Sequence, residues 1–438
     1  ALPYLEEAAR GGNLRKEDLY QLAYTQYRVG KYEEAAKNFD GLKNLESKMG
    51  QNSLYNLGDC HIKTGDKNSA RAAFKKASTM DFNKEIKEES QFLYGKLSYE
   101  LNFSRDAADA LQAIPANSTH YREAQELLSK VFLNTRNYAQ ALMIIEEMPN
   151  KSLEIRRAYQ KVAYYRGVQL MQEGKTAQAK NMFIKSLGRD YQHDRRITAL
   201  ANYWIGDINF NEKDYASSIN DFNQFLTYAK SQPNLFTDEA SVGTANYALG
   251  YNYLKKNDYT TAGRFFEESV NYFATRITRN EMDSDDVKNK IYPDALLRAG
   301  DCNLKNNKYP KALTFYNRVI SRKAQGSDYA YFQKSIIQGL QNDNAGKLVT
   351  LDNLIKRTPN SEFADNALLD LGSTYLQLGD LAKAQVPLKK LVRDYASTSD
   401  LVNSAYLKLG LIAYNQDNGD EALEYYKKVC TNNATSED

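Results

Sequence analysis

Leu57–Phe74 reads LGDCHIKTGDKNSARAAF, and Ala299–Tyr316 reads AGDCNLKNNKYPKALTFY. In both stretches a glycine precedes an aromatic residue by sixteen positions, and an alanine lies twelve positions after the glycine. The shared Gly-Asp-Cys is therefore either a chemical site or the most visible part of a periodic pattern. Recurrence of the spacing without the cysteine would favour the periodic pattern.

The spacing does recur along most of the chain. The pairs of a small residue and an aromatic residue are Ala23 and Phe39, Gly58 and Phe74, Gly167 and Phe183, Gly206 and Phe222, Gly250 and Phe266, Gly300 and Tyr316, and Gly410 and Tyr426. Weaker copies begin at Gly95, Ser129 and Gly372, and a degenerate copy lies near Leu348. Together they predict eleven repeats of roughly 34 to 39 residues with two longer joints.

Each repeat has the pattern of two helices. In the first repeat Leu22, Ala23 and Gln26 share one helical face, Gly30 supplies a turn, and a second helix begins at Tyr32. A glycine inside a helix costs about 1 kcal/mol relative to alanine. Its recurrence therefore indicates that another helix packs against bare backbone, with the later aromatic ring filling the space. The sequence predicts an all-α solenoid.

The pattern resembles the tetratricopeptide repeat, for which the second repeat supplies Leu54, Leu57, Gly58, Ala70 and Phe74. The resemblance covers Asp18 to Cys430, although the closing proline is mostly missing and the ninth repeat lacks its first-helix glycine. It implies a right-handed superhelix whose concave face binds a protein or peptide. Residues 367–392, ALLDLGSTYLQLGDLAKAQVPLKKLV, are similar to long bacterial cell-envelope repeat proteins, which implies a periplasmic or outer-membrane-associated location.

Composition excludes several other classes of protein. With 58 basic and 55 acidic residues the net charge is +3, so we expect no broad basic face and no nucleic-acid partner. No run of 18 apolar residues occurs, and we expect no transmembrane segment. Cys60, Cys302 and Cys430 are widely spaced and only three histidines are present, which argues against a disulfide framework, a metal site or a bound cofactor.

Two short motifs resemble parts of known ligand-binding loops. The sequence GKT at 174–176 resembles the end of a phosphate-binding loop, but Gln169 stands where the earlier glycine is needed and no strand precedes it. We interpret it as a turn between helices. Asp283, Asp285 and Asp286 lack the glycine and the later glutamate of a calcium loop, so we interpret them as a solvated insertion. No motif predicts an enzyme.

Aromatic residues recur three positions before the small packing residue. They are Tyr20, Tyr55, Phe92, Tyr164, Tyr203 and Tyr247. By the resemblance, this position lies toward the concave surface, where tyrosine rings would anchor a peptide or a partner helix. Packing between repeats is the alternative role. Family members that clamp acidic C-termini use lysine at this position, and tyrosine disfavours that class of partner.

We therefore expect a non-catalytic scaffold that binds a protein or peptide in the concave groove, and the resemblance of residues 367–392 implies a role in bacterial envelope assembly. The alternative is a carbohydrate-binding or cell-wall-associated envelope protein, because tyrosine platforms also suit sugar rings. An acidic joint at 276–292 is predicted to separate repeats one to seven, in 1–275, from repeats eight to eleven, in 293–438. The sequence does not specify an oligomeric state.

Overall fold

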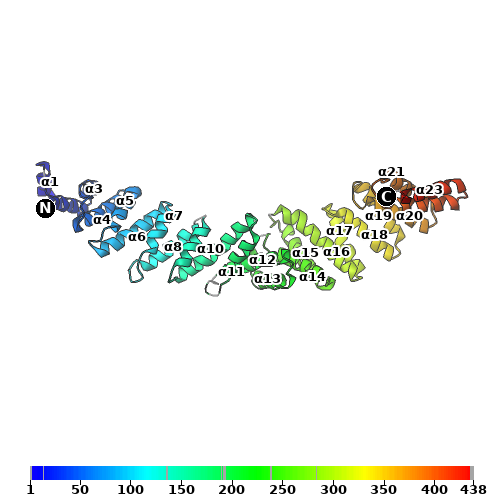
Figure 1. Ribbon diagram of the computed structural model, residues 1–438, viewed down its shortest axis with the longest axis horizontal. Coiled ribbons are helices and arrows are strands. Elements are labelled where there is room, and N and C mark those ends of the chain that lie inside the picture. The colour runs from blue at the N-terminus through cyan, green and yellow to red at the C-terminus, as the bar shows by residue number, and fades with distance from the viewer. Residues whose placement is uncertain are drawn as a thin grey trace. The chain divides into compact units, whose positions relative to one another are not determined.

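A computed structural model describes residues 2–12, 14–134, 137–188, 190, 194–236, 239–282 and 284–434. Within these ranges the regular elements are α-helices and short helical turns, and no strand is present (Figure 1). The expected all-α architecture is confirmed. Asp283, which belongs to the acidic joint, lies outside the described residues.

The chain forms two compact units, residues 1–205 and residues 206–438, and the boundary falls within α12 (Arg195–Asn211). The other helices of unit 1 are α1 (Leu2–Arg10), α2 (Lys16–Arg28), α3 (Tyr32–Asp40), α4 (Lys48–Lys63), α5 (Lys67–Ser78), α6 (Lys84–Glu100), α7 (Ser104–Gln112), α8 (Tyr121–Asn134), α9 (Tyr138–Glu147), α10 (Leu153–Gln172) and α11 (Thr176–Ser186). Those of unit 2 are α13 (Tyr215–Ala229), α14 (Val242–Lys255), α15 (Tyr259–Thr278), α16 (Tyr292–Lys305), α17 (Tyr309–Arg322), α18 (Ser327–Leu340), α19 (Asn344–Arg357), α20 (Ala364–Gln377), α21 (Leu381–Asp394), α22 (Val402–Asn415) and α23 (Gly419–Ala434).

Consecutive helices stack as pairs. In unit 1 the second helix α5 packs against its own partner α4 and against α6, which begins the next pair. In unit 2 α15 is held in the same way between α14 and α16. Within the described ranges, α2 to α23 give the eleven helix pairs that the spacing predicts.

The recurring glycines permit close approach of the two helices of a pair. A Cβ atom at Gly250 would lie 2.7 Å from the Cε1 and Cζ atoms of Phe266, and one at Gly167 would lie 2.5 Å from Cε1 of Phe183. Both rings are fully buried. The predicted contact between glycine and aromatic ring is confirmed, and at Gly95 a leucine, Leu111, takes the place of the ring.

Each pair turns at a fixed position, seven residues after the small packing residue. In the described residues this position has a positive φ at Gly30, Gly65, Asn102, Gly174, Lys213, Asn257, Asn307, Asn342, Gly379 and Asp417. The following residue often caps the second helix: Asp66 accepts a hydrogen bond from Ser69 N at 3.0 Å. Gly174, with φ of +74°, is therefore the turn residue of its repeat, as we interpreted it.

The same register identifies the ninth repeat. Asn342 is the left-handed turn residue, so the small packing position seven residues earlier is Ser335, which is fully buried. Leu351, sixteen residues after Ser335, is buried as well. Sequence analysis placed only a degenerate copy near Leu348, because Lys347 and Leu351 occupy the positions where the pattern expects a second small residue and an aromatic ring.

The two longer joints carry ordered structure. After α13 a 3₁₀ turn, η2 (Pro233–Leu235), leads to Phe236, whose buried ring lies 5.0 Å from that of Phe225. Before α16 a π-helical turn, η3 (Val287–Ile291), buries Val287. The acidic joint is thus helical and packed at its end, while Asp286 is exposed beside Lys290.

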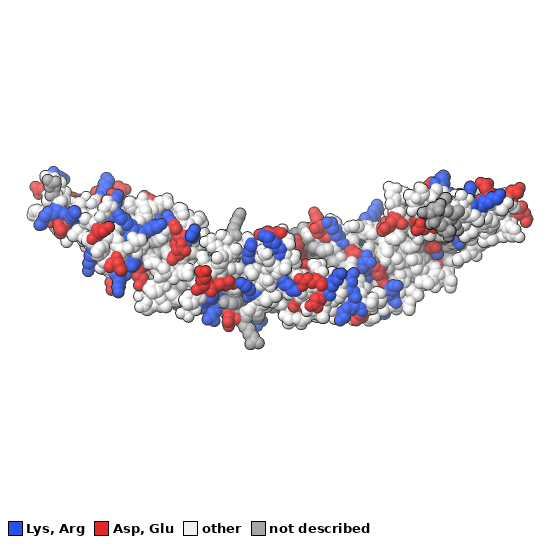
Figure 2. All heavy atoms as spheres, in the orientation of Figure 1, with Lys and Arg blue, Asp and Glu red and all other residues white. Residues whose placement is uncertain are grey.

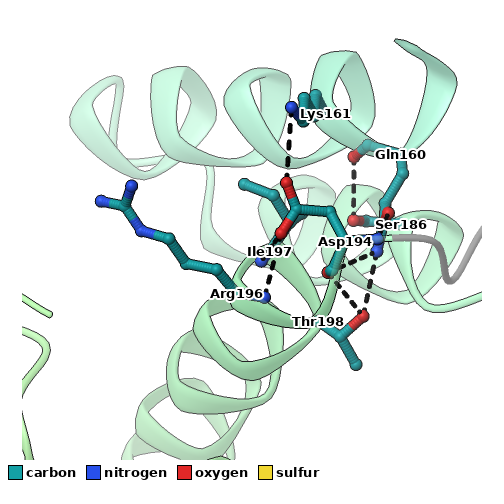
Figure 3. A network of polar contacts seen from close by, with 7 residues as sticks. All are labelled: Gln160, Lys161, Ser186, Asp194, Arg196, Ile197 and Thr198. Atoms are coloured by element: carbon teal, nitrogen blue, oxygen red, sulfur yellow. Dashed lines mark hydrogen bonds and ion pairs between the residues drawn. The ribbon is translucent and has the colours of Figure 1, made fainter. Parts of the chain in front are cut away.

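A glutamine links successive repeats within unit 1. Gln160 of α10 donates from Nε2 to the Asp194 carbonyl (3.2 Å) and to Thr198 Oγ1 (3.0 Å), and its Oε1 accepts from Asp194 N at 2.8 Å (Figure 3). Ser186 Oγ donates to the Gln160 carbonyl at 2.9 Å. Because Gln160 is fully buried, these bonds satisfy both its own amide and the backbone that begins α12.

Equivalent hydrogen bonds to the next repeat are made from the same position in other repeats. Gln51 occupies the same position, seven residues before the packing glycine, and bonds in both directions with the backbone of Asn83, which caps α6. In two repeats of unit 2 an aspartate takes this position: Asp328 accepts from Ser361 at 2.8 Å and Asp365 from Ser399 at 2.6 Å. In each of these helices a side chain of the N-terminal half therefore binds the start of the next repeat.

Candidate partner-binding site

The aromatic residues predicted to bind a partner first serve packing within their repeats. For Tyr20, Tyr55, Tyr164 and Tyr247 the ring centre lies near that of the aromatic residue on the second helix. The distance is 5.9 Å between Tyr20 and Phe39 and 5.8 Å between Tyr55 and Phe74. Tyr55 also donates a hydrogen bond to Glu89 at 2.8 Å, which ties it to the following repeat. The shared position therefore stabilises the repeats themselves.

Three of the six predicted residues are nearly covered. Phe92 is 4% exposed and stacks on His120, and Tyr164 and Tyr203 are each 7% exposed. The Tyr164 hydroxyl accepts a hydrogen bond from Trp204 Nε1 at 3.2 Å. Contact of the six residues with a partner stays a prediction, and these three contribute little exposed surface to it.

Tyr247 lines a large cavity in unit 2. The cavity has a volume of about 680 Å³ and lies along first helices of successive repeats, α14, α16 and α18, and the segment before α20. Its lining includes Tyr247, Asp294, Arg298, Tyr329, Glu362 and Phe363. This is the face on which the resemblance places partner binding.

The wall beside Tyr247 is fixed by a shared carboxylate. Asp294 accepts hydrogen bonds from the hydroxyl of Tyr247 at 2.9 Å and from that of Tyr251, and Arg298 Nε donates to it at 3.2 Å. Burial and the hydrogen bond to Asp294 raise the pKa of Tyr251 to about 12. Both phenols thus stay protonated at neutral pH and act as donors to Asp294.

A second carboxylate, Asp301, lies deeper in the same network. It accepts from Tyr316 at 2.7 Å and Tyr329 at 3.0 Å, and Arg298 Nη1 approaches its Oδ2 at 2.6 Å. Burial raises the pKa of Asp301 above its ordinary value, against the lowering effect of these donors. Burial alone would lower the pKa of Arg298, but the charges of Asp294 and Asp301 raise it. Arg298 therefore holds two first-helix carboxylates in place.

Potential metal ligands and cysteine thiols occur at separate positions among the described residues. No group of three or more His, Cys, Asp or Glu side chains there is arranged to hold a metal ion. Burial raises the pKa of the Cys60 and Cys302 thiols to about 12, which disfavours the reactive thiolate. The two thiols are packing residues, as expected, whereas Cys430 is exposed.

The charged surface is mixed. On the face shown in Figure 2, Lys and Arg side chains are interleaved with Asp and Glu side chains within each unit. Among the described residues, none of the helices combines the length and apolar character needed to cross a membrane.

Three family models of the tetratricopeptide repeat match parts of the sequence. They cover residues 51–84, 294–322 and 369–437. The first contains Gly58, the second contains Gly300 and the cavity residues Asp294, Leu297 and Arg298, and the third contains most of the last two repeats. Comparison with curated proteins finds no match.

Solved structures of helical proteins also match nearly the whole chain. The human IFIT1 dimer with PPP-AAAA shares 15% identity and a TM-score of 0.32, over 99% of this chain and 94% of that one. The apo form of RapI shares 12% identity and a TM-score of 0.40, over 88% of this chain and 98% of that one. The family models, rather than these distant similarities, identify the repeats.

Proposed function

Because the chain is a tetratricopeptide-repeat protein, we propose that it is a non-catalytic scaffold that binds a segment of a partner protein along its first helices. Such repeats generally mediate protein–protein interaction. Each repeat buries its face only against its neighbours, so the first helices form an extended surface suited to a peptide or a helix.

The observation that supports groove binding is the cavity of unit 2. Its polar wall is held by the bonds of Asp294 to Tyr247 and Arg298, so the side chains are ordered without a partner. Apolar and aromatic surface lies beside them at Leu297 and Phe363. A concave surface with fixed polar groups and aromatic anchors is typical of a binding site for a peptide.

Site-specific cross-linking tests this proposal. A photoreactive residue replaces Gln325, which is exposed and lines the cavity, and in a matched variant it replaces Thr314, which is exposed on the second helix α17. We expect one protein to cross-link at Gln325 in source cells and again when purified, and not at Thr314. Equal cross-linking at both positions, or none that survives purification, would refute groove binding in this unit.

The location in a bacterial cell envelope, and a role in envelope assembly, belong to the same proposal and rest on the resemblance of residues 367–392 alone. Fractionation of source cells tests them directly, because an envelope protein sediments with membranes or is released with the periplasm. The carbohydrate-binding alternative stays a prediction. Glycan binding that is abolished by blocking Gln325, without protein capture there, would favour it.

A further inference from the structure

The basic side chains of the unit 2 cavity are already paired. Lys290 lies 2.8 Å from Asp286, and Arg298 uses Nε and Nη2 on Asp294 and Nη1 on Asp301. Each basic side chain therefore forms an ion pair with a neighbouring carboxylate. An anionic ligand at Arg298 would have to compete with two part-buried carboxylates, whereas the Lys290–Asp286 pair is exposed and weak.

Two carboxylates of the cavity have no such compensation. Among the described residues, neither Asp328 nor Glu362 lies within ion-pair distance of a basic side chain. Asp328 is half-buried and accepts uncharged donors, Ser361 Oγ at 2.8 Å and the Tyr329 amide at 2.9 Å. Glu362 is exposed at the rim. The cavity lining thus holds three carboxylates, Asp294, Asp328 and Glu362, against two basic side chains, while Lys323 and Arg357 line the adjoining pocket that shares Asp328.

Aromatic surface adjoins these carboxylates. The rings of Tyr329 and Phe363 lie 5.6 Å apart, and Phe363 stacks on Phe332 at 5.4 Å. Both Tyr329 and Phe363 line the cavity and are only partly buried. A long aliphatic side chain with a cationic end would cover the rings and place its charge near the carboxylates.

We propose that this cavity receives a lysine or arginine side chain of the partner segment, with its charge at Asp328 and Glu362 and its stem against Tyr329 and Phe363. The inference rests on the proposed function, since it presumes that a segment lies along the first helices. Charge-assisted hydrogen bonds to carboxylates are stronger than neutral ones, so this side chain determines specificity within the groove. The chemistry is opposite to the capture of an acidic C-terminus.

Selection from a random peptide display library on the intact protein tests this inference. Peptides that cross-link to the photoreactive residue at Gln325 are sequenced, and their affinities are measured for the wild type, for Glu362→Gln and for Asp400→Asn. Asp400 is an exposed carboxylate of unit 2, remote in sequence from the cavity segments, and serves as the matched control. Each peptide is also made with citrulline or norleucine in place of its arginine or lysine.

We expect the selected peptides to share a basic residue. Replacing the basic residue of the peptide by its neutral analogue should weaken binding about tenfold, and so should Glu362→Gln in the protein. The neutral peptide and the Glu362→Gln protein together should lose little more, because both changes remove the same interaction. Asp400→Asn should leave the affinity unchanged. Peptides that cross-link at Gln325 without a shared basic residue, or that bind equally to Glu362→Gln, would overturn this inference and leave groove binding intact. Failure to select any peptide that cross-links there would overturn both proposals.

Discussion

Replacing a helical glycine by alanine ordinarily stabilises a protein, but the contact of Gly250 with Phe266 should make Gly250→Ala destabilising. Alanine at this position places Cβ 2.7 Å from two atoms of a fully buried ring. Overpacking of this kind costs about 1–3 kcal/mol, whereas replacing a helical glycine by alanine returns up to about 1 kcal/mol. We therefore expect Gly250→Ala to reduce the free energy of unfolding by about 1–2 kcal/mol.

Gly339 provides the matched control in the same unit. A Cβ there would meet only the flexible end of Lys347, at 3.5 Å or more. Gly339→Ala should consequently stabilise, by up to about 1 kcal/mol. In a Phe266→Leu background the cost of Gly250→Ala should shrink, because the clashing ring atoms are gone.

Urea unfolding followed by circular dichroism measures the overall effect on the full chain. Repeat arrays do not unfold in a single step, so hydrogen exchange of peptides from α14 and α15 locates the loss of stability. If Gly250→Ala stabilised the protein as much as Gly339→Ala, or if its cost were unchanged beside Phe266→Leu, the close-approach explanation would be refuted.

Three other predictions concern single side chains. Gln160→Ala leaves buried backbone groups unpaired and should destabilise unit 1 by about 1–3 kcal/mol in the same urea assay, whereas Gln112→Ala, at an exposed helix end, should have little effect. Burial raises the pKa of Asp207, so its ionisation opposes folding as pH rises. The stability gained by Asp207→Asn should therefore grow between the ordinary carboxyl pKa and the raised one, then level off; a constant difference across that range would contradict this. Iodoacetamide should label Cys430 in the native protein and the two buried thiols only after unfolding, as peptide mass spectrometry would show.

The repeats were predictable because each depends on steric contacts between residues at fixed spacing. Gly58 and Phe74 appear in the sequence at the separation that brings them together in space, so a linear pattern reports a three-dimensional contact. The ninth repeat was harder to recognise because Lys347, twelve residues after Ser335, is not small and Leu351, sixteen residues after it, is not aromatic. Its turn at Asn342 would have revealed it.

The candidate site was predictable only in part. The position of Tyr247 followed from the repeat, but the same rule also selected Tyr164, which packs against Phe183 and is nearly buried. Spacing along one helix does not show how far the next repeat covers a side chain. The cavity depends on Asp294 and Phe363, which come from different repeats and share no periodic signal.

The left-handed turn has a consequence for how this protein tolerates changes in length. Because the turn lies seven residues after the packing position in every described case, each hairpin is a module of constant register. Extra residues accumulate only where one hairpin gives way to the next, as before α14 and before α16. Whole hairpins can therefore be duplicated, lost or exchanged at these junctions without altering the internal fit of those that remain, so the number of repeats can evolve separately from their chemistry.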